Sequence, residues 1–375
     1  MTKIKVNYQE SITAKGNYVT KAIITLPDNT HLNTSELNFF ASNQWPTGKT
    51  HQVGEESKNT FIDKRRQTEL KFKISNQKGN KLIVEFPIQP ELYTLHFDTH
   101  KFLNYFQLPE IDLKITKYPD ANYFISFLYD NILDNFHNYY FQHKGTQIAY
   151  DIYSTNNKSE KPLIVFLHGS GERGFGNRLP LLGCAFPKKV LQYAKEKEDA
   201  VILVPQATWD NNLHGWFKED ILNTTYSLIK TTINQHNIDS NRVYLVGLSN
   251  GGATTWHLAA NHPELFAAIS PCCGYIYQSF KDFLGSTSTG RYMEPTPEEI
   301  KQLINMPVWA FAAKDDNVVN PKGTINTIKA LQNAGNKSAK ATLYEPGTVL
   351  PSPHNSWELA YENSELLPWL FAQHK

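Results

Sequence analysis

Hydrophobic and polar positions follow two different patterns along the chain. Up to about residue 118, β-branched and aromatic residues partly alternate with polar ones in short runs, at 4–12, 17–27, 35–42, 68–74 and 81–88. Turn-forming sequences such as PDNT, NQWPTG and NQKGNK separate these runs. Residues 1–118 are therefore predicted to form a small all-β domain, an antiparallel sandwich of immunoglobulin-like type.

The pattern then changes twice. Residues 119–137, which contain ANYFISFLYDNILDNF, are interpreted as a helical linker. From residue 138, a hairpin over 138–154 precedes nearly continuous apolar runs such as PLIVFLHG and DAVILVPQ, which are typical of strands buried on both faces. Segments of helical spacing, such as 218–236 and 322–335, lie between the later runs. Residues 138–375 are thus predicted to be a doubly wound α/β domain with a mostly parallel sheet.

Composition narrows the class of protein. The chain has 375 residues, of which 40% are hydrophobic and 19% charged, and its formal net charge is +1, as in an ordinary globular protein. Because there is no basic excess to attract phosphates, nucleic acid is not expected as a partner. No apolar run approaches the length that spans a bilayer, so no membrane partner is expected either. The composition leaves the oligomeric state open.

The first residues and the cysteines bear on location and cofactors. The segment MTKIKVNYQESITAK lacks the apolar core of a signal peptide, so we expect a cytoplasmic protein unless a leader has been removed. Of three cysteines, Cys272 and Cys273 are adjacent, a spacing that rarely forms a structural disulfide. No Cys/His spacing resembles a metal site, and we expect neither a metal nor an organic cofactor.

The segment VYLVGLSNGGATTWHLAANH contains the first candidate for chemistry. It places Ser249 in a G-x-S-x-G motif between an apolar run and a segment of helical spacing. Such a sharp strand-to-helix turn strains its central residue, and only glycines leave room around it. The turn would lift the Ser249 hydroxyl above the carboxyl edge of the sheet as a nucleophile. The competing interpretation is a helix N-cap serine.

A serine nucleophile needs a general base and an acid that orients the base. Where the serine lies in this kind of turn, the acid and then the base follow it along the chain. Asp315 and Asp316 come directly after the apolar run PVWAFAAK, and His354 lies in a loop between the last strand and the final helix. Taken singly, these residues would be a solvated turn and a surface histidine. In this order they indicate a triad whose acid is Asp315 or Asp316.

The segment FLHGSGERGFGN follows an early buried strand and is a candidate oxyanion loop. Gly169 and Gly171 let the backbone approach a substrate, so that the N–H of Ser170 can face a developing negative charge. The second donor is expected to be the N–H of Asn250, directly after the nucleophile. The competing interpretation, a phosphate-binding loop, lacks the G-K-[ST] ending.

Together these motifs resemble the α/β-hydrolase superfamily over about residues 138–375. The chain is similar to the branch that contains feruloyl esterases, polyhydroxyalkanoate-depolymerase-like esterases and prolyl-oligopeptidase-like hydrolases. The resemblance is carried by LHGSGERG, GLSNGGATTWHLAANHPELFAAISPCCG, PVWAFAAKDDNVV and HNSWELAYENSELLPWL. It implies Ser249 as nucleophile and His354 as base. It favours Asp316 as the acid, because the acid of this branch usually begins a D-P-x-V-P-like run, while Asp315 stays open.

Two departures from the branch stand out. Phe311-Ala312 replaces the usual F-H or H-G before the acid, and residues 275–305 form a long segment that would suit a lid or an acyl pocket. Some bacterial esterases of this type carry an N-terminal immunoglobulin-like domain, which agrees with the prediction for residues 1–118.

We therefore expect a serine esterase that hydrolyses carboxylic esters through an acyl-enzyme. Aromatic residues near the expected pocket would suit a hydroxycinnamoyl (feruloyl-type) or other small acyl group, although such residues are as often part of the core: Trp209, Trp216, Phe217, Tyr275 and Tyr277. The nearest alternative is a prolyl-oligopeptidase-like serine peptidase, but residues 1–118 are too few for its propeller. The alternative from another class is a non-catalytic binding protein on a hydrolase scaffold.

Overall fold

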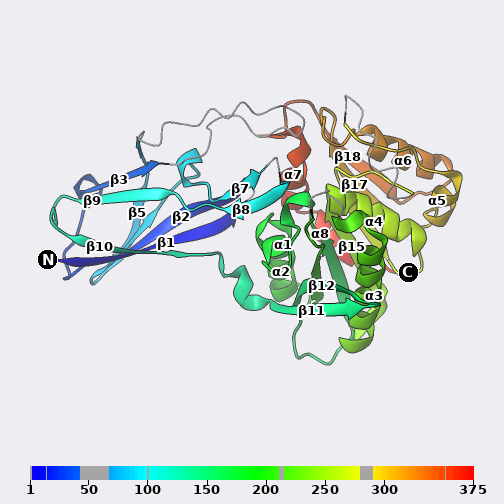
Figure 1. Ribbon diagram of the computed structural model, residues 1–375, viewed down its shortest axis with the longest axis horizontal. Coiled ribbons are helices and arrows are strands. Elements are labelled where there is room, and N and C mark those ends of the chain that lie inside the picture. The colour runs from blue at the N-terminus through cyan, green and yellow to red at the C-terminus, as the bar shows by residue number, and fades with distance from the viewer. Residues whose placement is uncertain are drawn as a thin grey trace. The chain divides into compact units, whose positions relative to one another are not determined.

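The chain divides into two compact units. Figure 1 labels the helices and strands of both. The computed structural model describes residues 2–13, 15–42, 67–98, 101–210, 215–278, 290–350 and 352–375. Unit 1 comprises Met1–Lys49, Glu56–Phe97 and Tyr105–Asn131, and unit 2 comprises Thr50–Glu55, Asp98–Asn104 and Ile132–Lys375. Each unit has a hydrophobic core of its own.

The N-terminal part of the chain is all-β, as its alternating pattern predicts. Its elements are β1 (Lys3–Thr13), β2 (Gly16–Thr25), η1 (Thr34–Glu36), β3 (Leu37–Ser42), β4 (Thr68–Glu69), β5 (Lys73–Lys78), β6 (Lys81–Glu85), η2 (Pro90–Leu92), β7 (Leu95–Asp98), β8 (Leu103–Phe106), β9 (Glu110–Ile115) and β10 (Asn122–Leu128). Among the described residues, the larger sheet has the order β10-β1-β2-β6-β5 and a second has the order β4-β3-β9. Strand β1 buries alternate residues such as Val6 and Tyr8, and the core lies between the two sheets. The expected β-sandwich is confirmed.

The helical linker expected over residues 119–137 is wrong for most of its length. Residues 122–128 form β10, which pairs in parallel with β1, from Lys3 opposite Asn122 to Gln9 opposite Leu128. Only the short 3-10 helix η3 (Asn131–Asn135) is helical there. The run is rich in aromatic and β-branched residues, which suit a pleated surface, so pairing with β1 decides its conformation. The run at 68–74, predicted as one strand, is divided between β4 and β5.

Unit 2 contains one long sheet. Its strands are β11 (His137–His143), β12 (Thr146–Tyr153), β13 (Lys161–Leu167), β14 (Val201–Gln206), β15 (Ile238–Leu248), β16 (Ala268–Cys272), β17 (Val308–Ala313) and β18 (Ala339–Tyr344). The sheet order is β11-β12-β14-β13-β15-β16-β17-β18, in which the β11–β12 hairpin is antiparallel and the strands from β13 onward pair in parallel. Strands β13 and β14 are buried along their whole length, as their continuous apolar runs predict.

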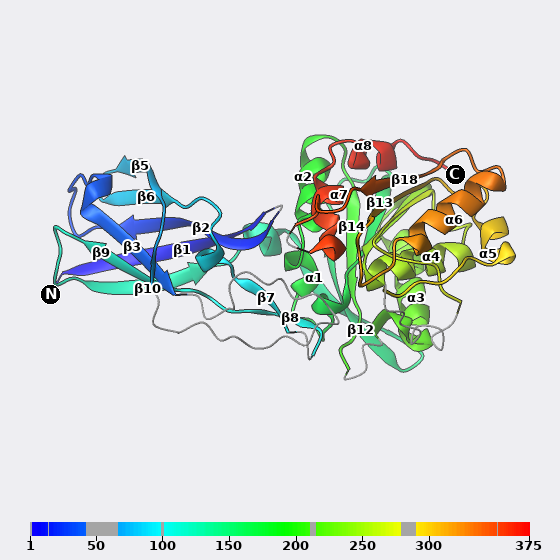
Figure 2. The ribbon, with the colours of Figure 1, turned by 90° about the horizontal axis from the view of Figure 1, so that it is seen from above.

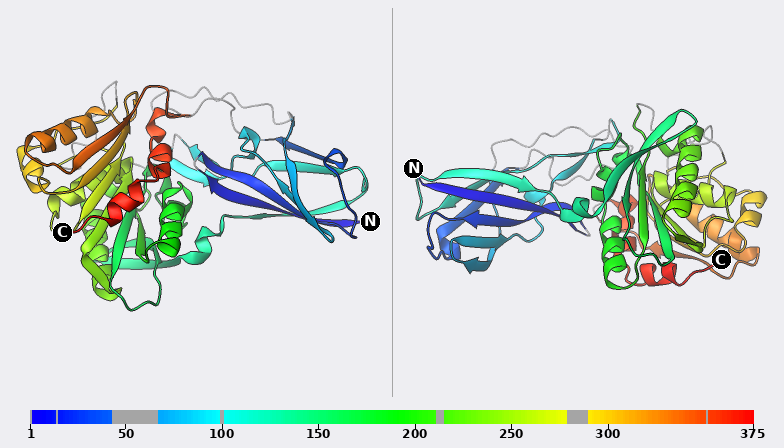
Figure 3. Two further views of the ribbon diagram at one scale, coloured as in Figure 1. Left: turned by 180° about the vertical axis from the view of Figure 1, so that it is seen from behind. Right: turned by 90° about the horizontal axis from the view of Figure 1, so that it is seen from below.

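Helices cover both faces of this sheet. They are α1 (Leu179–Leu182), α2 (Phe186–Glu196), α3 (Glu219–Gln235), α4 (Asn250–Asn261), α5 (Pro297–Gln302), α6 (Lys322–Asn333), α7 (Trp357–Glu362) and α8 (Leu366–Phe371), with the 3-10 helices η4 (Ser170–Glu172), η5 (Gly215–Phe217) and η7 (Pro353–Asn355). Figure 2 shows α1, α2 and α8 on one face and α3 to α6 on the other, and Figure 3 shows the same layers from two further directions. The predicted doubly wound α/β fold is confirmed.

This topology brings distant parts of the sequence to one edge of the sheet. Because β13 to β18 run in parallel, the loops that follow β13, β15, β17 and β18 all begin at their carboxyl ends. These are the loops that contain the candidate residues. None of the helices in the described residues is long and apolar enough to cross a membrane.

Candidate active site

Ser249 occupies the strained turn between β15 and α4. Its backbone has φ 52° and ψ −119°, a conformation that residues with a side chain rarely adopt. A Cβ added to Gly251 would lie 2.1 Å from the carbonyl oxygen of Leu167, and one added to Gly247 would lie 2.4 Å from that of Gly251. The Ser249 amide donates to the carbonyl of Cys272 at 2.9 Å, which fixes the turn to β16. The glycines of the motif are therefore required by close backbone approach.

His354 connects the serine to an acid. It lies in η7, after β18, and its Nε2 is 2.9 Å from the Ser249 Oγ. Its Nδ1 is 2.8 Å from Asp316 Oδ2. Since a carboxylate only accepts hydrogen bonds, Nδ1–H donates to Asp316, and Nε2 is left to accept the proton of the Ser249 hydroxyl. The arrangement is the one that a serine nucleophile requires.

The two neighbouring aspartates have different surroundings. Asp316 is 3% exposed, and its second oxygen, Oδ1, accepts from the amides of Val318 at 2.9 Å and Val319 at 3.1 Å. Asp315 instead accepts from the amide of Gly347 at 2.9 Å, through its Oδ2. Asp316 is therefore the carboxylate that is both buried and bonded to His354.

The charge of Asp316 determines the basicity of His354. Burial alone lowers the pKa of His354, but the nearby carboxylate of Asp316 and the hydrogen bond to it outweigh burial and raise the pKa to about 9. An imidazole held in this way is a strong proton acceptor for a hydroxyl.

The loop after β13 approaches the nucleophile closely. A Cβ on Gly169 would lie 2.7 Å from Leu248 Cδ1 and 3.6 Å from the Ser249 Cβ. Ser170 and Asn250 are the first residues of η4 and α4, so neither amide has an acceptor within its own helix. Amides of this kind suit a negatively charged ligand atom.

His168 and Trp216 hold this loop, a role that the sequence motifs do not predict. The His168 ring is fully buried, and its Nε2 accepts from the Ala207 amide at 3.0 Å, so its Nδ1–H donates to the Gly169 carbonyl at 2.6 Å. Burial lowers the pKa of His168 to about 3, so the ring is neutral. Trp216 Nε1–H donates to the His168 carbonyl at 2.8 Å. The sequence gives one indication that this loop is held by buried polar side chains, namely that a histidine and two charged residues lie in the same glycine-rich segment.

The aromatic residues expected at a pocket rim are mostly internal. Phe217, Tyr275 and Tyr277 are at most 2% exposed and form a cluster with Ala253, Val318 and Val319. The Ala253 amide donates to the Ser249 carbonyl, so this cluster lies directly beside the turn that contains the nucleophile. Trp216 is also buried, whereas Trp209 is partly exposed. Residues 279–289 of the expected lid or acyl pocket lie outside the described residues.

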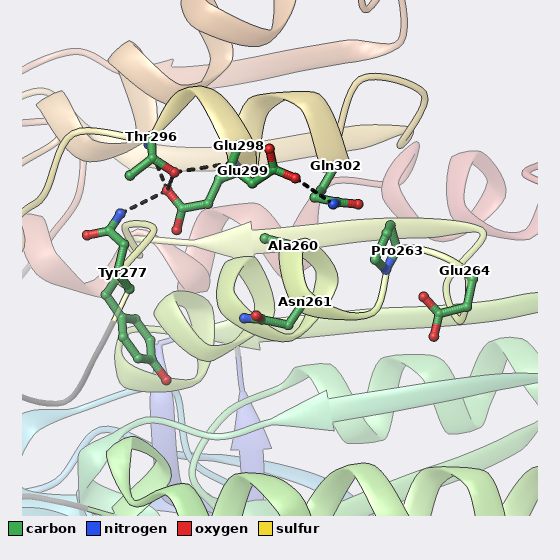
Figure 4. Close-up of a pocket in the computed structure, with 10 residues that line it drawn as sticks. Ala260, Asn261, Pro263, Glu264, Tyr277, Thr296, Glu298, Glu299 and Gln302 are labelled. Carbon is green, nitrogen blue, oxygen red and sulfur yellow. Dashed lines mark hydrogen bonds between the residues drawn. The ribbon is translucent and has the colours of Figure 1, made fainter.

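A pocket of about 380 Å³ lies elsewhere, between the C-terminal end of α4 and α5 (Figure 4). The candidate triad and oxyanion residues do not line it, although Tyr277, one of the aromatic residues expected near a substrate pocket, does. The Glu299 carboxylate in this pocket accepts hydrogen bonds from the Thr296 amide at 2.7 Å and from the Gln278 side chain at 2.8 Å. The pocket is therefore separate from the candidate active site.

Known proteins with similar sequences are esterases. The family model described as Esterase PHB depolymerase matches residues 148–291. Feruloyl esterase B of Neurospora crassa is 26% identical over 219 residues, which cover 50% of this chain and 70% of that protein. Acetylxylan esterase A of Emericella nidulans is 34% identical over 87 residues, 22% of this chain and 29% of that protein.

A solved structure aligns with nearly the whole chain. The crystal structure of a thermostable esterase aligns with a TM-score of 0.72 over 99% of both chains at 24% sequence identity, which supports the fold. The expected α/β-hydrolase fold and the expected class, a carboxylic-ester hydrolase, are confirmed by these comparisons.

Proposed function

We propose that this chain, a carboxylic-ester hydrolase with the α/β-hydrolase fold, uses Ser249 as nucleophile, His354 as general base and Asp316 as the acid that orients His354. The proposal rests on one observation above all. Two hydrogen bonds, of 2.9 Å and 2.8 Å, join the Ser249 hydroxyl, the His354 ring and the Asp316 carboxylate in the order that acyl transfer needs.

The reaction follows from these contacts. Ser249 Oγ attacks the ester carbonyl carbon while its proton passes to His354 Nε2. The bond to the alcohol then breaks, and the alcohol leaves with that proton, so that an acyl-serine remains. Water gives a proton to His354 and its oxygen to the acyl carbon. The acid is released, and the proton returns to Ser249.

The amides of Ser170 and Asn250 are proposed to stabilise the oxyanion. Both begin helices beside the nucleophile, and the loop passes so close that a Cβ on Gly169 would lie 3.6 Å from the Ser249 Cβ. Donors that face the oxygen only when it is negatively charged lower the barrier more than they strengthen substrate binding.

The substrate is proposed to be a small acyl ester, with hydroxycinnamoyl esters first. The names of the relatives, a feruloyl esterase and an acetylxylan esterase, motivate this order. The partly exposed Trp209 offers one aromatic side chain near the loop. The cytoplasmic location stays a prediction.

Units 1 and 2 are proposed to be separate domains, an immunoglobulin-like domain and a catalytic domain. Their boundary would lie near residue 131, where the contacts of the chain change from one unit to the other. This differs from the expected boundaries at 118 and 138, because β10 belongs to the larger sheet of unit 1.

The test is turnover of a chromogenic ester by the wild type and by Ser249→Ala. We expect Ser249→Ala to lose about a thousandfold or more in kcat while it stays folded. A panel of feruloyl, acetyl-sugar, short aliphatic and peptide substrates then assigns the class. Near-full activity of Ser249→Ala would refute the mechanism, and a preference for peptides or for aliphatic chains would refute the proposed substrate.

A further inference from the structure

The loop after β13 contains a buried charged pair that the proposed chemistry does not use. Glu172 is 8% exposed and Arg173 is 1% exposed, and they lie two and three residues after Ser170 in the loop that faces the nucleophile. Arg173 has a clear role in the backbone of the loop, because its Nε donates to the Ser170 carbonyl at 2.9 Å. The role of the Glu172 carboxyl group needs a separate explanation, since burying a carboxyl group is costly.

The Glu172 carboxyl group is enclosed by the loop itself. Its Oε1 accepts a hydrogen bond from the Asn104 side chain. Its Oε2 faces the loop backbone, since a Cβ on Gly169 would lie only 3.2 Å from it, and it lies 3.9 Å from His168 Nδ1. A Cβ on Gly183 would lie 2.6 Å from Oε1.

Oε2 is buried and makes no hydrogen bond of ordinary geometry with the described residues. Burial raises the pKa of Glu172 to about 7, although the nearby amides of Glu172 and Gly169, and then Arg173 and Asn104, favour the charged form. The titratable groups that face it are the neutral His168, the cation Arg173, and two buried groups whose pKa values are raised by burial, Cys184 and Tyr361. Its charge therefore changes in the neutral pH range.

We propose that Glu172 is a positioning residue: its carboxylate holds the Gly169–Ser170 segment so that the Ser170 amide faces the oxyanion. This inference rests on the proposed function. One oxygen of the carboxylate accepts from Asn104, and the other lies beside the backbone at Gly169, where the amides of Gly169 and Glu172 favour its negative charge. The protonated acid and an amide both lack this negative charge, so the attraction between the side chain and the loop amides weakens.

The matched variants are Glu172→Gln and Glu10→Gln. Glu10 in β1 is also a buried glutamate, 1% exposed, with one oxygen hydrogen-bonded to an Asn side chain and the other without a partner among the described residues. Glu10 belongs to unit 1, and Glu172 belongs to unit 2. We expect Glu172→Gln to lower kcat by about ten- to a hundredfold with little change in KM, somewhat less than the loss of an oxyanion donor. Glu10→Gln should leave kcat unchanged.

Two readouts separate positioning from folding. A trifluoromethyl ketone, which Ser249 converts to an anionic hemiketal, should bind Glu172→Gln more weakly by the same factor as the loss in kcat. The thermal midpoint of Glu172→Gln at pH 8 should not be lower than that of the wild type. Because the pKa of Glu172 is raised to about 7, its buried carboxyl group loses its proton as pH rises towards 7 and destabilises the native state, and the variant lacks this charge. Wild-type kcat should also show an extra decline of about tenfold or more below pH 7, absent in Glu172→Gln.

Three outcomes would overturn the inference. They are an unchanged kcat in Glu172→Gln, equal losses in Glu10→Gln, and a loss in ketone affinity that does not follow kcat. If Glu172→Gln does not fold, the wild-type profile decides, and a single decline that follows His354 alone counts against Glu172. Failure of the proposed function has a different signature, namely activity that survives Ser249→Ala.

Discussion

Both units bury a carboxyl group, but in different settings. In unit 1, Glu10 lies within strand β1, where its Oε1 accepts from the Asn17 side chain at 2.9 Å and from the Thr94 hydroxyl at 3.0 Å. In unit 2, Asp316 lies in the loop after β17, where it bonds two backbone amides and His354. Glu10 is thus hydrogen-bonded by two uncharged side chains. Asp316 is hydrogen-bonded to the His354 ring, which in turn is hydrogen-bonded to the Ser249 hydroxyl.

The difference shows why the candidate chemistry lies at strand ends. Within a strand, the backbone is fixed by the ladder, and a buried polar side chain is satisfied by its neighbours on the same sheet. At a strand end, loops from several strands can meet, and a residue can take a strained conformation such as that of Ser249. Burial has a similar cost in both places, but only the second place brings a nucleophile, a base and an acid together.

The largest effect should come from removing the charge of the acid. Asp316→Asn keeps the shape of the side chain, but an amide no longer fixes the imidazole or stabilises its charged form, so kcat should fall by about four powers of ten. Asp315→Asn, one residue away, is the matched control and should stay within about threefold of the wild type. Steady-state ester hydrolysis measures both. Equal losses would contradict the assignment of the acid.

The next effect is the dependence of activity on pH. His354 must be neutral to accept a proton, and its pKa is raised to about 9, so kcat/KM should rise about tenfold per pH unit up to about pH 9 and then level off. In the Asp316→Asn variant the carboxylate no longer raises the pKa of His354, so the residual activity should level off at a lower pH. A pH–rate profile corrected for spontaneous hydrolysis measures this. A wild-type plateau from pH 6 upward would contradict it.

The smallest effect concerns stability and compares a glycine of each unit. Gly251→Ala in unit 2 would place a methyl group 2.1 Å from the Leu167 carbonyl oxygen, which should cost about 1–3 kcal/mol or more and lower activity by moving the turn. Gly79→Ala in unit 1, in the turn before β6, meets nothing closer than 3.6 Å and has φ 58°. It should cost about 1–2 kcal/mol through backbone strain alone, with activity unchanged. Denaturant unfolding and ester turnover distinguish the two.

The sequence predicts the α/β unit better than it predicts the connection between the units. Continuous apolar runs identify β13 and β14 because strands buried on both faces need no alternation. The glycines around Ser249 identify its turn because no side chain fits there. The helix predicted at residues 122–128 is wrong because a run of aromatic residues is compatible with either a helix or a strand. The partner that decides between them, β1, is more than a hundred residues away.

Local sequence predicts some residues of the candidate site but not others. Ser249 and His354 follow from motif order. The choice between Asp315 and Asp316 depends on which carboxylate the loop turns inward, and adjacency in sequence does not decide that. Glu172 could not be assigned from the motif alone, because its role depends on a contact with Asn104, 68 residues earlier in the chain.

The central claim is that Ser249 is the nucleophile because His354 and Asp316 activate it. The most direct measurement is labelling of the folded protein with a fluorophosphonate, followed by peptide mapping by mass spectrometry. We predict one phosphonylated residue, Ser249, at a rate that falls by several powers of ten in His354→Ala, with the label lost in Ser249→Ala. A label on another residue, or none on the active wild-type enzyme, would contradict the account.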